Sequence, residues 1–407
     1  MMDTASQQRV RDAEREFLRK AGWLFPLAGL LAPLALGGPF WRWVEGQNPL
    51  PLDWSRLATW PALAGVVVLG LVPLAWRLTL RIRLRPGVSL LLGLIAALAA
   101  DGMLRLPQAQ APLWLASRAR LGADQFFMRE VCYVRLEEAA GRTAASPALI
   151  LVGSSQMLHG VDDQLLRDLV APVPVIRRAM FGLTPLKALA MMDFVPFRTG
   201  DVCIQYLSEF DFTNQEEFPF SWFRPYATLP TFTLVMQCID PQVKARHWEG
   251  VIDYLLATRL ESWRSRDFLR QILFHFWRAD RPDGTASGMG GEEIRALVER
   301  AQGELVPAPA EWKAFEIYSR VLAAIGVRQW VFEGEVNPEI RTPVRLEIRA
   351  DVRERVWQRL FGTETRYIDR QAQDLELGEG FWRDMTHLNE AGRKQLTRRI
   401  AEEWNRP

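Results

Sequence analysis

Short apolar segments alternate with amphipathic segments after residue 146, and this alternation restricts the fold more than any other feature of the chain. Each apolar segment has the length and composition of a strand that is buried on both faces of a sheet. The predicted strands are PALILVG (147–153), VPVIRRAM (173–180) and DVCIQYL (201–207). Because strand–helix–strand units form parallel sheets covered on both faces, the pattern predicts a three-layer α/β/α domain.

The segments between these strands have helical spacing, and Thr184 followed by Pro185 is a typical helix start. An aromatic-dense loop and a mostly helical insertion interrupt the alternation at about 208–290. The expected later elements are a helix at about 309–325, a strand and loop at 326–338, a short strand at 366–369 and an amphipathic helix at 387–404. We therefore expect one domain at 146–407 that carries the insertion.

Three apolar stretches precede this domain, at 21–41, 57–76 and 86–104. The first two carry no charge, and the third has one acid, Asp101, near its end. A membrane helix needs about 20 apolar residues. The sequence therefore predicts a membrane anchor at 1–106 with three N-terminal transmembrane helices in contact with lipid, followed by a helical connector at 107–145.

Arginine is concentrated before the first apolar stretch and in the loop at 77–85 between the second and third. Positive residues favour the cytoplasmic side of a membrane. With three spans, the N-terminus is cytoplasmic and the domain lies on the periplasmic side of a bacterial inner membrane. With only two spans, the domain would be cytoplasmic.

Charge and metal-ligating residues restrict the possible partners. The net charge of +2 offers no bulk attraction to nucleic acid. The four histidines are scattered and no metal-ligand spacing occurs, so we expect neither a metal site nor another cofactor. Three cysteines allow one disulfide and one free thiol, and Cys203 is typical of a small buried residue.

Polar residues follow each predicted strand, where the reactive groups of a doubly wound sheet gather. The first strand is followed by Ser154 and Ser155, and the second by Gly182. The third is followed by Ser208 and Asp211, and the fourth by Glu333 and Asn337. We expect Ser208, Asp211, Glu333 and Asn337 to contact substrate.

The segment before the last helix contains Asp384 and His387, three residues apart. In a tight turn, the aspartate can accept a hydrogen bond from the ring Nδ1–H of the histidine and leave Nε2 free to act as a base. A serine hydroxyl is a poor nucleophile without such a base. The pattern therefore predicts a catalytic triad of Ser155, His387 and Asp384.

These two segments resemble motifs of the SGNH (GDSL-like) hydrolase family. VGSSQMLHG is similar to the first block of the family, with Gly-Ser-Ser in place of Gly-Asp-Ser, and DMTHLNEAG is similar to the last block. The resemblance implies that Ser155 is the nucleophile, that Ser154 replaces an aspartate, and that the backbone N–H groups of Ser155 and Gly182 form an oxyanion hole. The asparagine of the third block has no clear counterpart.

The Gly-Ser-Ser variant and the FEGEVNP stretch are similar to anchored family members that modify cell-envelope polymers. The resemblance implies O-acetyl transfer to a polysaccharide acceptor, with the acyl group supplied through a membrane-bound O-acyltransferase partner. A carbohydrate acylesterase is the alternative, because sequence does not show how well the site excludes water. A non-catalytic scaffold of a polysaccharide-export complex is the third possibility.

Simpler interpretations exist for the same residues. A Gly-Ser-Ser turn after a strand can serve only as a turn. His159 is closer to Ser155 in sequence than His387 is, but it lacks an orienting acid other than Asp162 or Asp163. The aromatic residues of the insertion can bind sugar, rest at a membrane interface or pack the insertion onto the sheet. The arginine-rich face of the last helix is typical of solvated surface.

Overall fold

The computed structural model describes most of the chain after residue 146. The described residues are 147–195, 197–213, 215–268, 306–334, 337–338, 343–362, 365–368, 377, 379–384 and 386–406, with 101–102, 104–105, 114, 131–132 and 134–135. The sheet and the helices around it belong to one compact unit, which includes Gly141–Ser265 and Arg278–Pro407. In the other unit, the Trp114 ring packs edge-on against Phe268 at 4.7 Å.

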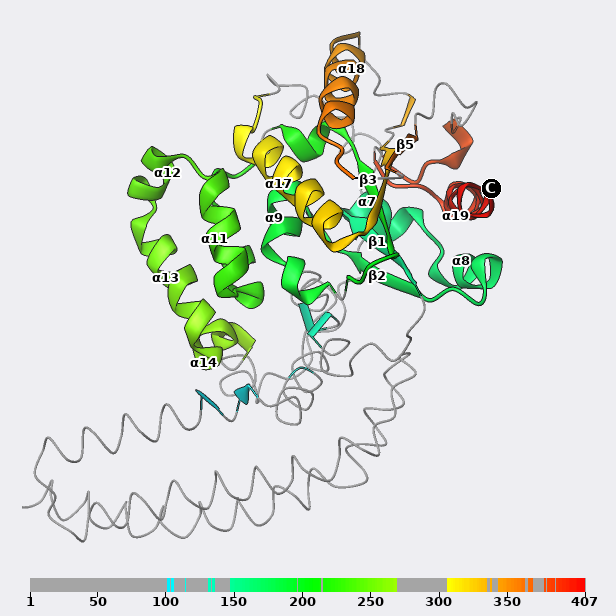
Figure 1. The fold of residues 1–407 in the computed structure, drawn as a ribbon. Coiled ribbons are helices and arrows are strands. Elements are labelled where there is room, and N and C mark those ends of the chain that lie inside the picture. Colours follow the sequence, from blue (N-terminus) through cyan, green and yellow to red (C-terminus); the bar gives the residue numbers. More distant parts are fainter. Residues whose placement is uncertain are drawn as a thin grey trace, which may run out of the picture. The chain divides into compact units, whose positions relative to one another are not determined.

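The centre of the fold is a five-stranded parallel sheet with the order β2-β1-β3-β4-β5 (Figure 1). Its strands are β1 (Leu149–Gly153), β2 (Val175–Ala179), β3 (Val202–Leu207), β4 (Arg328–Glu333) and β5 (Arg366–Ile368). Residues of β1 pair with β2 on one side and β3 on the other, so β1 is where the strand order reverses. Open α/β sheets bind ligands outside the carboxyl ends of the strands at such a point.

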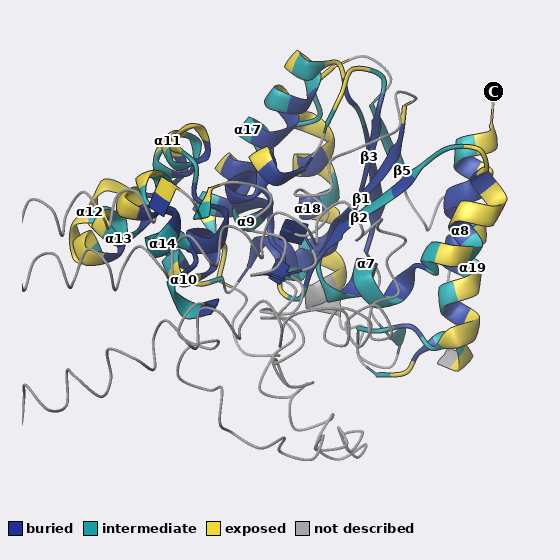
Figure 2. Cartoon of the chain, turned by 90° about the horizontal axis from the view of Figure 1, so that it is seen from below, coloured by how far each residue is buried: buried dark blue, intermediate teal, exposed yellow. Residues whose placement is uncertain are grey.

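Helices cover both faces of the sheet, as Figures 1 and 2 show. One face carries α7 (Ser155–Gly160), α8 (Asp163–Val170) and α19 (Glu390–Asn405). The other carries α9 (Pro185–Ala190), α17 (Pro309–Ile325) and α18 (Pro343–Gln358). The apolar residues of the strands alternate between these faces because successive side chains point to opposite sides of a strand.

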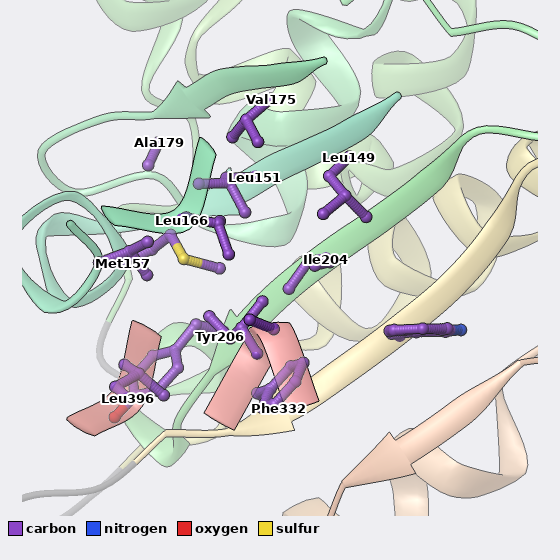
Figure 3. Packing of buried hydrophobic residues seen from close by; sticks show 14 of the residues in the cluster. Leu149, Leu151, Met157, Leu166, Val175, Ala179, Ile204, Tyr206, Phe332 and Leu396 are labelled. Carbon is purple, nitrogen blue, oxygen red and sulfur yellow. The ribbon is translucent and has the colours of Figure 1, made fainter. Parts of the chain in front are cut away.

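The packing of the α8/α19 face is drawn in Figure 3. One buried cluster includes Leu149 and Leu151 of β1, Ile204 of β3, Leu166 of α8 and Leu396 of α19, and all five are fully or almost fully buried. Burial of a leucine or isoleucine side chain contributes about 1.5–3 kcal/mol. This cluster therefore holds α19 on this face of the sheet, beside α8 and α7.

Local signals set the ends of several helices. The side chain of Asp162 accepts a hydrogen bond from Leu165 N (3.2 Å) at the start of α8, and that of Asn389 accepts one from Gly392 N (3.1 Å) at the start of α19. Gly326 ends α17 in a left-handed conformation with φ of 82°, which glycine adopts without a steric penalty. The chain then enters β4.

The insertion is helical as far as it is described. Its elements are η3 (Glu209–Phe212), α10 (Phe220–Phe223), η4 (Arg224–Tyr226), α11 (Leu229–Cys238), α12 (Pro241–Arg246), α13 (Trp248–Arg259) and α14 (Glu261–Arg264). Phe212 stacks on Trp312 of α17 at 3.9 Å, and Phe223 packs against Tyr254 at 5.4 Å. These aromatic side chains are buried, so Phe212 packs the start of the insertion against α17, and the Phe223–Tyr254 pair packs within the insertion.

The prediction of three transmembrane helices is contradicted. Among the described residues, no helix combines the length and the apolar character that crossing a bilayer requires. Asp101, at the end of the third apolar stretch, is in a helical turn and forms an i,i+4 ion pair with Arg105 (3.1 Å), which is an ordinary pairing along a helix. The stretches at 21–41 and 57–76, and most of the predicted connector, lie outside the described residues.

The cysteines form no disulfide in the described structure, and the expectation that Cys203 is a small buried residue is confirmed. Cys132, Cys203 and Cys238 are all free and buried. Cys203 lies within β3, and burial raises the pKa of its thiol to about 12. A buried thiol of this kind packs as a small apolar residue.

Candidate active site

Ser155 lies at a sharp turn where β1 passes directly into α7. Ser154 is the residue before the helix, and Ser155 is its first residue. The turn requires Gly153, because a Cβ there would lie 2.8 Å from Cβ of Met157 and 3.3 Å from the carbonyl oxygen of Tyr206. The first N–H groups of a helix have no partner within the helix. The turn therefore presents both the hydroxyl and the backbone N–H of Ser155 at the carboxyl edge of the sheet.

Asp384 and His387 share one tight turn in front of α19. The Asp384 carboxylate accepts hydrogen bonds from the backbone N–H groups of Thr386 (3.0 Å) and His387 (2.9 Å). The backbone N–H of Arg383 donates to the His387 carbonyl (2.9 Å) and closes the turn. The spacing of three residues thus lets one carboxylate hold both the backbone and the ring of the same histidine.

The three side chains form a continuous chain of contacts. Nδ1 of His387 lies 2.9 Å from both carboxylate oxygens of Asp384, and Nε2 lies 2.9 Å from Oγ of Ser155. Because an ionised carboxylate only accepts hydrogen bonds, the proton of the neutral ring belongs on Nδ1. Nε2 is then the acceptor for the serine proton. This arrangement is that of a nucleophile, a general base and an orienting acid.

The charge state of Asp384 suits this role. Partial burial acts to raise the pKa of its carboxyl, but hydrogen bonds from the His387 ring and the Thr386 backbone hold that pKa well below its usual range. The carboxylate is therefore ionised at neutral pH. It can stabilise a positive charge that develops on His387.

His159 lies beside His387 without replacing it. The two ring centroids are 5.2 Å apart with an interplanar angle of 88°, and the His159 ring is also 5.2 Å from that of Phe181. Burial and the nearby charges of His387 and Arg383 lower the pKa of His159 to about 4. Asp162 forms an ion pair with Arg393 (2.8 Å), and Asp163 forms one with Arg177 (3.3 Å). Neither aspartate therefore orients the ring of His159.

Gly182 lies in the turn that follows β2, in a left-handed conformation with φ of 62°. The N–H of Leu183 donates to the Met180 carbonyl (3.2 Å) across this turn. Nζ of Lys187 donates to the Gly182 carbonyl (2.8 Å) and lies 5.6 Å from the Trp222 ring centroid. Lys187 thus ties the turn to helix α10 of the insertion, a contact that no sequence motif indicated.

Ser208 and Asp211 are buried at the end of β3. The Asp211 carboxyl accepts hydrogen bonds from the backbone N–H of Ser208 (2.7 Å) and from its hydroxyl (3.2 Å), so the two residues cap η3. The structure therefore gives them a local structural role rather than the predicted exposure to substrate. Burial raises the pKa of Asp211 to about 7.

Glu311 is a second buried acid near this edge, and sequence reasoning did not single it out. Its carboxylate accepts hydrogen bonds from the Thr184 hydroxyl (2.9 Å) and from Leu186 N (2.7 Å) at the start of α9. Burial raises the pKa of Glu311 to about 8, and burial also lowers the pKa of Lys187. The only available signal was an acid in the first turn of a predicted helix, which is typical of surface residues.

Glu333 and Asn337 both follow β4, and the structure gives Glu333 a structural role. Glu333 is buried at the end of β4 and forms ion pairs with Arg349 (2.7 Å) and Arg353 (2.9 Å) of α18. It therefore fastens α18 to the sheet. Asn337 is half-buried in the loop after β4, and its contact with substrate stays a prediction.

Comparisons with protein-family models, with curated proteins and with solved structures find no significant match to this chain.

Proposed function

We propose that Ser155, His387 and Asp384 form the centre of a serine acyltransferase or esterase of the SGNH type. The observation that carries the proposal is the contact of Nε2 of His387 with Oγ of Ser155 at 2.9 Å while Asp384 holds Nδ1. A turn serine needs no such base.

In the first half-reaction, Oγ of Ser155 bonds to the carbonyl carbon of an ester. Its proton moves to Nε2 of His387, and the imidazolium is stabilised by Asp384. The tetrahedral intermediate collapses, the ester C–O bond breaks, and the leaving alcohol takes the proton from His387. The product is an acyl-serine with a neutral His387.

The oxyanion of the intermediate would be bound by the backbone N–H groups of Ser155 and Gly182. Each such donor contributes about 2.7–4 kcal/mol to transition-state stabilisation where one has been removed in other enzymes. The hydrogen bonds from Leu183 N to the Met180 carbonyl and from Lys187 Nζ to the Gly182 carbonyl support a fixed turn at this place. No asparagine donor is assigned.

In the second half-reaction, a hydroxyl group replaces the leaving alcohol. Its proton moves to Nε2 of His387, its oxygen bonds to the acyl carbon, and Oγ of Ser155 leaves and recovers the proton. A sugar hydroxyl makes the protein an O-acyltransferase, and water makes it an esterase. We favour transfer of acetyl to an extracytoplasmic polysaccharide, with a membrane-bound O-acyltransferase as the donor partner, on the resemblance of the two motifs.

A non-catalytic scaffold is the second candidate, and the lack of a third-block asparagine favours it. The two candidates differ in what Ser155→Ala does. With 4-nitrophenyl acetate and the full chain, the wild type should release 4-nitrophenol and acquire one acetyl group on Ser155, detectable by intact mass. Ser155→Ala should do neither. Equal turnover by both proteins, or an unlabelled wild type, would leave the scaffold as the better proposal.

The periplasmic location of the domain stays a proposal too, since an extracytoplasmic acceptor requires it. A reporter that is active only in the periplasm, fused after Pro407, should be active. Activity of a cytoplasm-specific reporter at the same position would contradict this location.

A further inference from the structure

His159 is a second imidazole within the same site, and the proposed mechanism does not use it. Ser155 and His159 are four residues apart on α7, so their side chains lie on the same side of that helix. The His159 ring stands edge-on to His387 and to Phe181, with ring centroids 5.2 Å apart in both pairs. The three rings therefore form a row that begins at the base contacting Oγ of Ser155.

The ring nitrogens of His159 are available to a ligand. Within the part of the chain that the structure describes, neither nitrogen has a hydrogen-bond partner, and the residue is only half-buried. The low pKa of His159, about 4, keeps the ring neutral at ordinary pH. A neutral imidazole offers one N–H donor and one nitrogen acceptor, which matches the donor and acceptor of a single hydroxyl group.

His159 is not arranged as a second base. No carboxylate orients its ring, because Asp384 is occupied by His387, Asp162 by Arg393 and Asp163 by Arg177. The positive charges of His387, Arg383 and Arg177 also lower the pKa of His159, whereas only the negative charge of Asp384 raises it. The contribution of His159 is therefore to orient a group and not to take up a proton.

We propose that His159 and Phe181 form the acceptor subsite, in which His159 hydrogen-bonds a sugar hydroxyl and Phe181 packs against the C–H face of the sugar ring. This inference rests on the proposed acyl-serine mechanism. It places the incoming hydroxyl next to Nε2 of His387, to which its proton must move. His159 acts only when the acceptor is a sugar, because water is small enough to reach the acyl-serine without being oriented by it.

If this subsite exists, a change at His159 should alter the ratio of acetyl transfer to hydrolysis without abolishing the formation of the acyl-serine. With 4-nitrophenyl acetate as donor and methyl β-glucoside as acceptor, the full-length wild type should form both acetate and acetylated glucoside. His159→Phe keeps an aromatic ring against His387 and Phe181 but removes both nitrogens. It should lower the ratio of transfer to hydrolysis by about tenfold, the effect of one lost hydrogen bond, and change hydrolysis less than about twofold.

Two further variants complete the design. His159→Gln keeps one donor and one acceptor and should recover part of the transfer ratio. His247→Phe is the matched control, because His247 lies in the insertion before α13 and should leave the ratio unchanged.

Three results would overturn the subsite. They are a wild type that makes no acetylated glucoside, an unchanged ratio in His159→Phe, and a parallel loss of hydrolysis and transfer in that variant. Failure of the mechanism itself is recognised separately, by retention of hydrolysis in Ser155→Ala.

Discussion

Nε2 of His387 lies 2.9 Å from Oγ of Ser155, although 232 residues separate them in the chain. The contact depends on how α19 is held beside α7 and α8. Thr397 of α19 accepts a hydrogen bond from Asp162 N (2.8 Å), and Arg393 pairs with the Asp162 carboxylate (2.8 Å). Leu396 packs so close to Gly160 that a Cβ on Gly160 would lie 3.2 Å from it.

The first prediction concerns the contacts that hold α19 beside Asp162. Thr397 is fully buried, and Thr397→Val preserves its shape but leaves the Asp162 N–H without its acceptor. We expect a loss of about 1–3 kcal/mol in the free energy of unfolding, measured in urea. Turnover of 4-nitrophenyl acetate should also fall, because α19 carries the turn that holds His387. Exposed Thr233 on α11 provides the control, Thr233→Val, and an equal effect there would contradict the assignment.

Ser154 and Ser155 should differ sharply on substitution. Ser154 makes no side-chain capping bond, whereas Ser155 contacts His387. We expect Ser155→Ala to abolish turnover and Ser154→Ala to retain most of it, with unfolding curves close to wild type for both. Loss of activity in Ser154→Ala alone would move the nucleophile to the neighbouring residue.

Asp384→Asn should reduce kcat by roughly 10³- to 10⁴-fold, less than Ser155→Ala does. The amide can still accept from the backbone of Thr386 and His387, but it can donate to Nδ1 and so favour the wrong tautomer. Steady-state kinetics should show the loss in kcat rather than in KM. If Asp384→Asn is as active as wild type, the carboxylate serves only to shape the turn.

Substitution of Glu333 should affect the stability of the fold but not the catalytic step. Removing one partner from a buried ion pair costs about 3–5 kcal/mol, and Glu333→Gln removes the carboxylate from the buried pair with Arg349. We expect a large fall in stability with kcat per folded molecule unchanged. Glu390→Gln removes an exposed ion pair with Lys394, and its unfolding curve should stay close to that of the wild type because solvent screens such pairs. A kcat defect in folded Glu333→Gln would restore a substrate role for Glu333.

The buried acids predict a dependence of stability on pH. In the unfolded chain these carboxyls ionise near pH 4, whereas burial raises the pKa of Asp211 to about 7 and that of Glu311 to about 8. Between these pH values the folded protein binds more protons than the unfolded chain. The free energy of unfolding should therefore decrease as the pH rises from 5 to 8.

Asp211→Asn and Glu311→Gln should each reduce that decrease by at least about 1.4 kcal/mol, the equivalent of one pKa unit. Urea unfolding at pH 5 and pH 8 measures the difference. Glu249→Gln, on the exposed side of α13, is the control. Identical pH slopes in all three variants would show that Asp211 and Glu311 are ionised in the folded protein.

Much of the sheet could be predicted from local patterns in the sequence. The runs that become β1, β2 and β3 are short and apolar, and such segments can satisfy their backbone groups and bury their side chains only inside a sheet. The turn of Asp384 and His387 was also local, since three residues span the distance between a carboxylate and a ring nitrogen. The apolar stretches near the N-terminus, read by length alone, led to the membrane prediction that the described structure contradicts.

Which polar residues face the site was decided by tertiary structure. Ser208, Asp211 and Glu333 follow strands as Ser155 does, yet each is buried by partners that lie elsewhere in the fold or in the next turn. Glu311 reaches Thr184 and Leu186 only because α9 and α17 pack together. The sequence determined which segments could be strands and which turn could orient a histidine. Only the packing of α19 against α8 and α7 decided that this histidine reaches Ser155, because long-range contacts leave no periodic signal in the chain.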